Sequence, residues 1–225
     1  MKTYPVIDRI IYSRHTEWLR YAAQAMQIAL WQASGRSFRT PHSYKQRLVR
    51  AYARLFHLDV FVETGTQYGC MLLAMQRHFK SLYSIELHPD LFAFCRKRLA
   101  RYPHVHLLEG NSADELPNIL ERIDCDALFW LDAHFFRYGL SGGSADDPCP
   151  LMAELEAILR HPYRGHVILV DDAHYFVQRS GYPALEEVRG LVHRIRPDLH
   201  WNNEGDVIRI TPRAIGVTPP SSRIE

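Results

Sequence analysis

Aspartate and histidine residues follow two apolar runs of the chain at a similar short spacing. The runs 127–131 and 166–170 are followed by Asp132-Ala133-His134 and by Asp171-Asp172-Ala173-His174. Three carboxylates that meet at one point repel each other, so such a cluster needs a cation or raised pKa values. Mg²⁺ is a hard ion that prefers oxygen ligands and keeps several waters. The two segments therefore predict a site for magnesium or another divalent metal, with Asp132, Asp171 and Asp172 as its ligands.

The histidines of these segments are candidates for a general base. His134 lies two residues past Asp132, and it points to the same side if the backbone continues as an extended strand. His174 is the second candidate. For each histidine the alternative is a structural role, in which the imidazole forms a hydrogen bond that steadies a neighbouring aspartate.

A glycine turn with an acid before it lies earlier in the chain. Val60-Phe61-Val62 is typical of a strand buried on both faces, and the pattern Glu63-x-Gly65-Thr66-x-x-Gly69 follows it. A dinucleotide loop needs Gly-x-Gly-x-x-Gly, but here Gln67 stands at the position of the middle glycine. The acid would repel a pyrophosphate and attract a cation. The turn therefore favours S-adenosylmethionine, which carries an ammonium and a sulfonium group and no phosphate.

A second apolar run, 82–85, ends in Glu86 about twenty residues after the first acid. With these motifs the chain resembles the class I S-adenosylmethionine-dependent methyltransferases, and the resemblance covers most of the sequence after about Ala53. It implies that Glu63 takes the methionine amino group, often through water, and that Glu86 takes the ribose hydroxyls. It also implies that three residues of the turn line the cofactor: Gly65, Thr66 and Gly69.

The segment Gly110-Asn111-Ser112-Ala113 departs from this family pattern. The family often has an acid that contacts adenine where Asn111 stands, and the asparagine can still form a hydrogen bond with the base. Ser112 is a further candidate for cofactor binding. Its alternative role is structural, because Ser112-x-x-Glu115 is a capping box for the next helix.

The acids at the two later strand ends are similar to those of metal-dependent small-molecule O-methyltransferases, including the macrocin type that acts on sugar hydroxyls. This resemblance implies a metal that holds two substrate oxygens and lowers the pKa of the attacking hydroxyl. It also places Asp132 beside the cofactor. We expect in-line displacement at the sulfonium methyl group, with the acceptor oxygen positioned by the site. The long segment from Phe135 to Pro150 contains several glycines and is expected to be a lid, or else a surface excursion.

Apolar runs alternate with amphipathic segments along the chain, which predicts an α/β protein with right-handed crossovers. We expect the Rossmann-like methyltransferase fold, a mostly parallel seven-stranded sheet with helices on both faces and an N-terminal helical extension. Glu63, Glu86, Asp132 and Asp171 would then all lie at the carboxyl ends of strands, where ligands of such sheets bind. The predicted organisation is an extension over 1–57, the S-adenosylmethionine-binding domain over 58–213 and a flexible tail over 214–225.

The extension is expected to form two helices, about 15–34 and 43–56, which pack across the cofactor or form a homodimer contact. In the second helix Arg47, Arg50 and Arg54 lie near one face. This face is expected to be solvated, with a patch for an acidic substrate, a nucleic acid or a partner as the alternative.

Composition sets the remaining limits. The chain has 225 residues, with 27 Lys and Arg against 25 Asp and Glu, and this formal charge of +2 argues against a nucleic-acid partner. No run approaches the about 20 apolar residues of a membrane helix, and no secretory leader is evident, so a cytoplasmic location is expected. The four scattered cysteines fit free thiols in a reducing compartment.

Two other functions remain open from the sequence. One is a metal-dependent hydrolase that uses the Asp and His cluster and needs no cofactor. The other is a non-catalytic module that binds S-adenosylmethionine and interacts through its N-terminal helices. The identity of the small-molecule acceptor does not follow from the residues.

Overall fold

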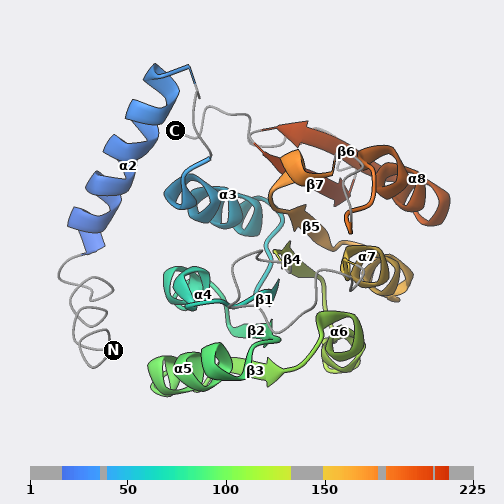
Figure 1. The fold of residues 1–225 in the computed structure, drawn as a ribbon, viewed down its shortest axis with the longest axis horizontal. Coiled ribbons are helices and arrows are strands. Elements are labelled where there is room, and N and C mark those ends of the chain that lie inside the picture. Colours follow the sequence, from blue (N-terminus) through green and yellow to red (C-terminus); the bar gives the residue numbers. More distant parts are fainter. Residues whose placement is uncertain (1–16, 36–39, 133–148, 177–180, 205, 213–225) are drawn as a thin grey trace.

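The structure of the protein is a computed structural model, which describes residues 17–35, 40–132, 149–176, 181–204 and 206–212 (Figure 1). Seven strands form one sheet in the order β3-β2-β1-β4-β5-β7-β6. Their bounds are β1 Val60–Thr64, β2 Ser81–Glu86, β3 Val105–Glu109, β4 Ala127–Leu131, β5 Val167–Val170, β6 Leu199–Glu204 and β7 Val207–Pro212. The first five are parallel, and β7 pairs antiparallel with both β5 and β6. The predicted fold class is confirmed.

Helices cover both faces of this sheet (Figure 1). They are α2 Glu17–Ala33, α3 His42–Leu55, α4 Cys70–Met75, α5 Pro89–Leu99, α6 Ser112–Leu120, α7 Leu151–Arg160 and α8 Leu185–Ile195, with the short 3₁₀ turn η1 at Ala173–Tyr175. One apolar core joins α6, α7 and α8 to one face of the sheet. The other core joins α3, α4 and α5 to the opposite face.

The central strands are apolar on both sides because each of these cores needs its own set of side chains. In β4, Phe129 belongs to the core under α6, α7 and α8, while Leu128 and Trp130 belong to the other. In β1, Val62 belongs to the core under α6, α7 and α8, and Phe61 belongs to the other core. The parallel pairing of β1 with β4 fixes the register of these side chains, and it therefore also fixes where the residues that follow the two strands lie.

The N-terminal helix α3 is built into the core beside the sheet. Tyr44, Leu48, Val49 and Tyr52 are buried, and they share a core with Met71 and Leu72 of α4. Helix α2 lies outside α3, where Trp31 packs on Tyr44 with ring centroids 5.2 Å apart. The helical extension that we expected is thus present, and α3 contributes side chains to the same core as the strands.

The arginine face of α3 is not fully solvated. Arg50 is buried, its guanidinium lies 5.0 Å from the centroid of the Tyr21 ring, and it donates a hydrogen bond to Gln24 of α2. Arg54 remains exposed. The prediction of a solvated face is wrong for Arg50, because α2 covers that side of α3.

Two local predictions also need correction. The helix after the glycine turn ends at Met75, not at Phe79, because the chain turns over 76–78 before β2. The cap of α6 is Asn111, whose side-chain oxygen accepts a hydrogen bond from the Ala113 amide at 3.0 Å. Ser112 is the first residue inside the helix, so the predicted capping box at Ser112 is wrong.

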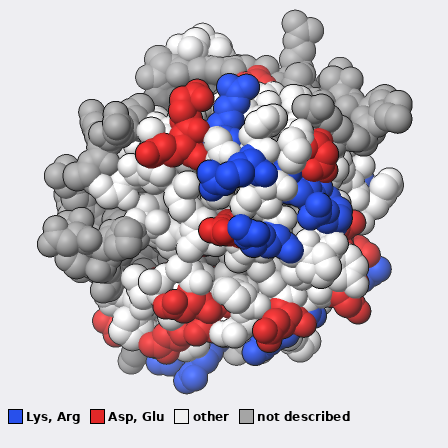
Figure 2. Space-filling model, turned by 90° about the vertical axis from the view of Figure 1, so that its right-hand side faces the viewer, with Lys and Arg blue, Asp and Glu red and all other residues white. Residues whose placement is uncertain are grey.

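Charged side chains of both signs lie close together on the face shown in Figure 2, which is the right-hand side of Figure 1, where α8 and α7 lie. Among the described residues of this face, Lys and Arg lie beside Asp and Glu and form no broad patch of a single sign. Within the described residues, no helix has the length and apolar character needed to cross a membrane.

Candidate functional site

Asp132 and Asp171 extend two neighbouring parallel strands by one residue. The Asp132 amide donates a hydrogen bond to the Thr64 carbonyl at 3.0 Å, and the Asp171 amide donates one to the Leu131 carbonyl at 3.0 Å. The sheet pairing therefore continues past β4 and β5, and it holds both aspartates at the same edge. The structure brings these two predicted residues together as the sequence indicated.

Asp172 follows with a left-handed backbone, at φ 52° and ψ 46°. Left-handed backbone is uncommon outside glycine, although aspartate tolerates it better than most residues. The Asp172 amide donates a hydrogen bond to the Asp171 carboxylate at 2.7 Å. This turn directs the two carboxylates toward a common cation, which comes from a distant part of the chain.

That cation is Lys45, in the first turn of α3. Its ammonium lies 2.6 Å from the Asp171 carboxylate and 3.0 Å from an oxygen of Asp172. The Lys45 side chain is 12% exposed and that of Asp171 4%, so this ion pair is largely withdrawn from water. Lys45 is not among the residues predicted from the sequence, because nothing near it in the chain signals a partner 126 residues away.

The charges of this cluster act on each other strongly. Burial acts to lower the pKa of Lys45, but the charges of Asp171 and Asp172 outweigh it and raise the pKa above its usual value. Burial and the nearby charge of Asp132 raise the pKa of Asp171 well above its usual value, and Lys45 offsets only part of this rise. The cluster thus holds its negative charge only with a cation beside it.

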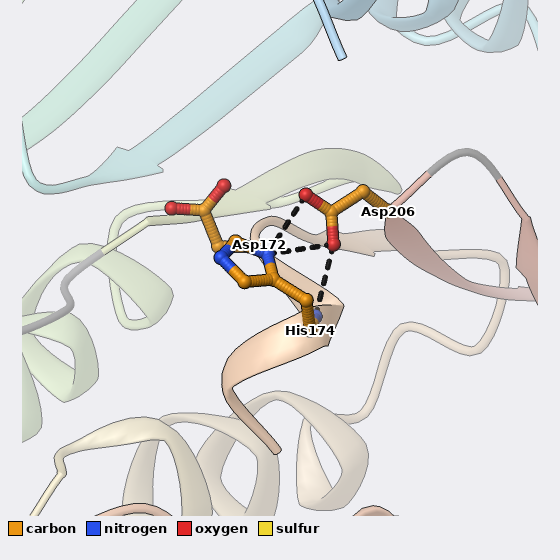
Figure 3. Close-up of side chains that lie close together, drawn as sticks. All are labelled: Asp172, His174 and Asp206. Carbon is orange, nitrogen blue, oxygen red and sulfur yellow. Dashed lines mark hydrogen bonds and ion pairs between the residues drawn. The ribbon is translucent and has the colours of Figure 1, made fainter. Parts of the chain in front are cut away.

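His174 has a carboxylate partner from another element (Figure 3). Its Nδ1 lies 2.9 Å from both carboxylate oxygens of Asp206, and its amide donates to the same carboxylate at 2.9 Å. Asp206 sits in the turn between β6 and β7. If Nδ1 carries the proton, as an ionised carboxylate partner requires, Nε2 is left free to accept one.

Asp172, His174 and Asp206 also form a group that could hold an ion, since one ligand atom of each lies within 4.8 Å of the others. In Figure 3 the His174 imidazole is joined to Asp206 and not to Asp172. His134, the other candidate base, lies outside the described residues, as does most of the predicted lid.

Two tyrosines lie near this acid cluster. Tyr175 and Tyr182 stack with ring centroids 5.4 Å apart and an angle of 23° between their planes. Burial, with added repulsion from neighbours that include Cys149 and Asp172, raises the pKa of Tyr182 to about 12. The two stacked rings therefore provide a partly buried aromatic surface beside the carboxylates.

The glycine turn after β1 has three residues with positive φ: Gly65 at 84°, Gln67 at 48° and Gly69 at 70°. The Glu86 carboxylate closes this turn from β2, because it accepts hydrogen bonds from the Gln67 amide at 2.7 Å and the His88 amide at 2.9 Å. Burial raises the pKa of Glu86, and these backbone hydrogen bonds oppose the rise. Glu86 is thus fixed at the carboxyl end of β2, where it was predicted.

Glu63 lies beneath the same turn in a chain of hydrogen bonds. The Ser84 hydroxyl donates to the Glu63 carboxylate at 2.8 Å and lies 2.6 Å from the Thr66 hydroxyl. Glu63 is 3% exposed, and burial raises its pKa well above the usual value. The Thr64 hydroxyl next to it is buried, with no hydrogen-bond partner among the described residues. A positively charged, polar ligand would satisfy both groups.

The side chains of Asn111 and Ser112 are less suitably placed for the predicted contacts with the cofactor. Asn111 is exposed and its side-chain oxygen caps α6, whereas Ser112 is buried. Two exposed apolar side chains were not predicted as part of the site: Tyr68 lies in the glycine turn, and Leu87 directly follows Glu86. An apolar residue directly after a strand-ending acid is the signal that could have identified Leu87.

No model of a protein family matches the chain, and no curated protein matches it. Solved structures do. An O-methyltransferase from Bacillus cereus in complex with SAH has 13% identity and a TM-score of 0.53, over 84% of this chain and 90% of that one. A protein from Staphylococcus aureus, proposed to be a caffeoyl-CoA O-methyltransferase, has 17% identity and a TM-score of 0.55, over 88% and 99% of the two chains. An SAH-bound methyltransferase from Podospora anserina has 16% identity and a TM-score of 0.52, over 90% and 97%.

These likenesses confirm the fold that the strand order describes. At such low identity they concern the path of the chain and the arrangement of its strands, and they do not identify the acceptor or the metal. The acids at the strand ends are the features of this chain that bear on its function.

Proposed function

We propose that this chain is an S-adenosylmethionine-dependent methyltransferase that transfers a methyl group to a hydroxyl of a small molecule. The observation that carries the proposal is the position of four acids at one edge of the sheet. Glu63 and Glu86 lie at the ends of β1 and β2 under and beside the glycine turn, and Asp132 and Asp171 follow β4 and β5. The first pair suits a cationic cofactor and the second a reacting hydroxyl.

The cofactor would be held by residues of the glycine turn and the two glutamates. The donor set fits S-adenosylmethionine, because buried Glu63 forms no ion pair with any described residue and the residues of the turn, 63–69, include no cationic side chain for a phosphate. Glu86 would take the ribose hydroxyls. Asn111 and Ser112 would lie on the adenine side of the site, with Leu87 as apolar surface.

S-adenosylmethionine supplies the methyl group: its sulfur–carbon bond breaks with the electron pair left on sulfur, a carbon–oxygen bond forms to the acceptor, and the hydroxyl proton leaves to a base. His174 is the base that the geometry favours among the described residues, because Asp206 fixes its ring and its tautomer. His134 remains the second candidate. The stacked Tyr175 and Tyr182 suit an acceptor that contains a ring.

The acid cluster needs a cation, and two are possible. A divalent metal would be held by Asp132, Asp171 and Asp172, whose oxygens are the ligands that Mg²⁺ prefers, and it would polarise the acceptor oxygen. Lys45 is the other cation, and its ammonium is in contact with two of these three residues. The donor types fit the metal, but the place beside Asp171 and Asp172 is taken by Lys45.

The experiment that tests the function is a calorimetric titration of the full chain with S-adenosylmethionine, with NADH as the control ligand. We expect a dissociation constant on the order of micromolar for S-adenosylmethionine and no heat from NADH. Transfer of a labelled methyl group to a panel of hydroxylated acceptors, sugars and phenols included, then follows. Hydrolysis without the cofactor would favour the hydrolase instead, and tight binding with no transfer would favour the non-catalytic module.

A second copy of the chain is the partner that we propose for α2. Trp18, Leu19, Met26 and Leu30 are exposed on this helix, while Ile28 and Trp31 face α3. Exposed apolar side chains that gather on one helix are typical of an interface. Sedimentation should show a dimer that Met26→Lys and Leu30→Lys together convert to a monomer, and a wild-type monomer would exclude the contact.

A further inference from the structure

The negative charge at the ends of β4 and β5 is concentrated in a small space. Asp171 is buried, Asp172 is half-buried, and Asp132 is near enough to raise the pKa of Asp171. Carboxylates placed in this way lose their charge or keep a cation. The ammonium of Lys45 lies 2.6 Å from Asp171 and 3.0 Å from Asp172, which is the distance of a direct hydrogen-bonded ion pair.

Lys45 is held in place by its helix. The residues on either side of it, Tyr44 and Gln46, are buried, and Leu48 and Val49 are fully buried one turn later. The Ser43 hydroxyl donates to Gln27 of α2 at 2.6 Å. Because α3 is anchored on both sides of Lys45, the ammonium can leave the carboxylates only by a change of its own side-chain conformation.

The position of Lys45 is unfavourable without its partners. It lies in the first turn of α3, where the helix dipole disfavours a positive charge, and this turn has no acidic residue. Its side chain is also largely removed from water. The two carboxylates offset both effects, which distinguishes this pair from an exposed ion pair of little energetic weight.

A divalent ion on the same oxygens would come too close to the ammonium. Mg²⁺ binds carboxylate oxygens at about 2.1 Å. An ion bound to both Asp171 and Asp172 would therefore be a close neighbour of a nitrogen that lies 2.6 and 3.0 Å from them. The two cations would repel each other in a largely buried site, so one excludes the other.

We propose that Lys45 is the resident cation of this site, that it holds Asp171 and Asp172 in place of a divalent metal, and that its removal converts the cluster into a metal site. The inference concerns a positioning residue, because Lys45 acts through the two aspartates. Its consequence for catalysis rests on the proposed function, whereas its consequence for metal binding does not.

The test is a titration of the metal-stripped full chain with Mn²⁺, a paramagnetic ion that accepts the same oxygen ligands as Mg²⁺, with free Mn²⁺ measured by electron paramagnetic resonance. We expect the wild type to bind Mn²⁺ more weakly than about 1 mM and Lys45→Met to bind one ion at least about tenfold more tightly. Lys45→Arg keeps the charge and should behave as the wild type. Adding Asp171→Asn to Lys45→Met should abolish the new site.

Either of two results would overturn the inference. One is tight binding of a single Mn²⁺ by the wild type that Asp171→Asn alone abolishes, which would mean that the ammonium moves aside. The other is a folded Lys45→Met variant that binds no better than the wild type. The wild-type measurement stands even if Lys45→Met does not fold.

Binding of S-adenosylmethionine, measured separately by calorimetry, should be the same in the wild type and in Lys45→Arg. If the proposed function is wrong, neither the wild type nor Lys45→Arg should bind the cofactor, and the Mn²⁺ result would be unaffected. If the cofactor binds, methyl transfer by the wild type should persist in EDTA. Strict dependence on added Mg²⁺ would contradict the role of Lys45 and leave the methyltransferase proposal intact.

Discussion

His174 Nδ1 lies between the two carboxylate oxygens of Asp206 and so links η1 to the turn between β6 and β7. Nδ1 of the histidine lies 2.9 Å from each carboxylate oxygen of the aspartate, and the histidine amide donates to the same group. Such a pair selects one tautomer of the ring and fixes its orientation, as a general base requires.

Asp206→Asn should therefore lower the rate of methyl transfer by about two orders of magnitude, because the neutral asparagine side chain cannot stabilise the protonated His174 imidazole as the carboxylate does. The asparagine oxygen can still accept from the His174 amide, so the fold should persist. Steady-state kinetics across pH is the measurement. Asp124→Asn removes an exposed carboxylate before β4 and serves as control. An unchanged rate in Asp206→Asn would rule out His174 as the base.

Glu86 and Glu109 offer a matched pair for the cofactor prediction. They are register partners at the ends of β2 and β3, but Glu86 is buried against the glycine turn and Glu109 is exposed. Glu86→Gln should weaken binding of S-adenosylmethionine by about tenfold or more, since it loses a charged hydrogen-bond acceptor. Glu109→Gln should leave the calorimetric dissociation constant unchanged. Equal effects of the two changes would exclude a specific role for Glu86.

Two glycines with nearly the same φ allow the effect of backbone strain to be distinguished from the effect of a steric contact. Gly69 has φ +70° and Gly35 has φ +69°, but a Cβ on Gly69 would lie 3.3 Å from Leu99 Cδ1, while one on Gly35 would meet nothing within 4 Å. Gly35→Ala should lower the free energy of unfolding by about 1 kcal/mol through its backbone. Gly69→Ala should lower the free energy of unfolding further, and it should also weaken binding of the cofactor. Urea denaturation measures the free energy of unfolding of both variants. Equal decreases in the two variants would show that Leu99 moves easily to make room for the new Cβ at position 69.

Stability should fall in acid because of a histidine pair at the other end of the sheet. The Ala127 amide donates to His166 Nδ1 at 3.0 Å, His166 Nε2 lies 2.8 Å from His161 Nδ1, and His161 Nε2 lies 3.1 Å from the Leu120 carbonyl. Burial, and then the neighbouring His161, lower the pKa of His166 to about 4. Both the burial and this chain of hydrogen bonds favour the neutral form of the His166 ring.

Since the unfolded His166 titrates near 6.5, the unfolded state binds more protons than the folded state between about pH 6.5 and 4. The free energy of unfolding should decrease as the pH falls through this window, by up to about 3 kcal/mol from this group. Urea denaturation at a series of pH values is the measurement. His166→Asn should flatten this dependence, and His193→Gln, at an exposed position, should not.

The strands and their acidic ends could be predicted because both signals are local. An apolar run buried on two faces is recognisable in the sequence, and the residue after it must lie at the edge of the sheet. Glu63, Glu86, Asp132 and Asp171 were placed in this way.

Lys45 and Asp206 could not be placed from the sequence. Lys45 is one of several basic residues on an amphipathic helix, and its partners follow a strand 126 residues later. Asp206 lies in a turn between two strands, where an aspartate is ordinary. Burial of Arg50 likewise depends on where α2 packs, which the periodicity of α3 does not determine. The choice of Asn111 over Ser112 as the cap is a shift of one residue between two good capping side chains.

The position of β7 inside the sheet has a consequence for synthesis of the chain. It lies between β5 and β6, yet it follows both in sequence. Until residues 207–212 leave the ribosome, β5 presents an open, apolar edge, and the turn that carries Asp206 does not exist. An exposed edge of this kind pairs readily with other chains. The nascent protein therefore exposes this edge to unwanted pairing until β7 is available to cover it.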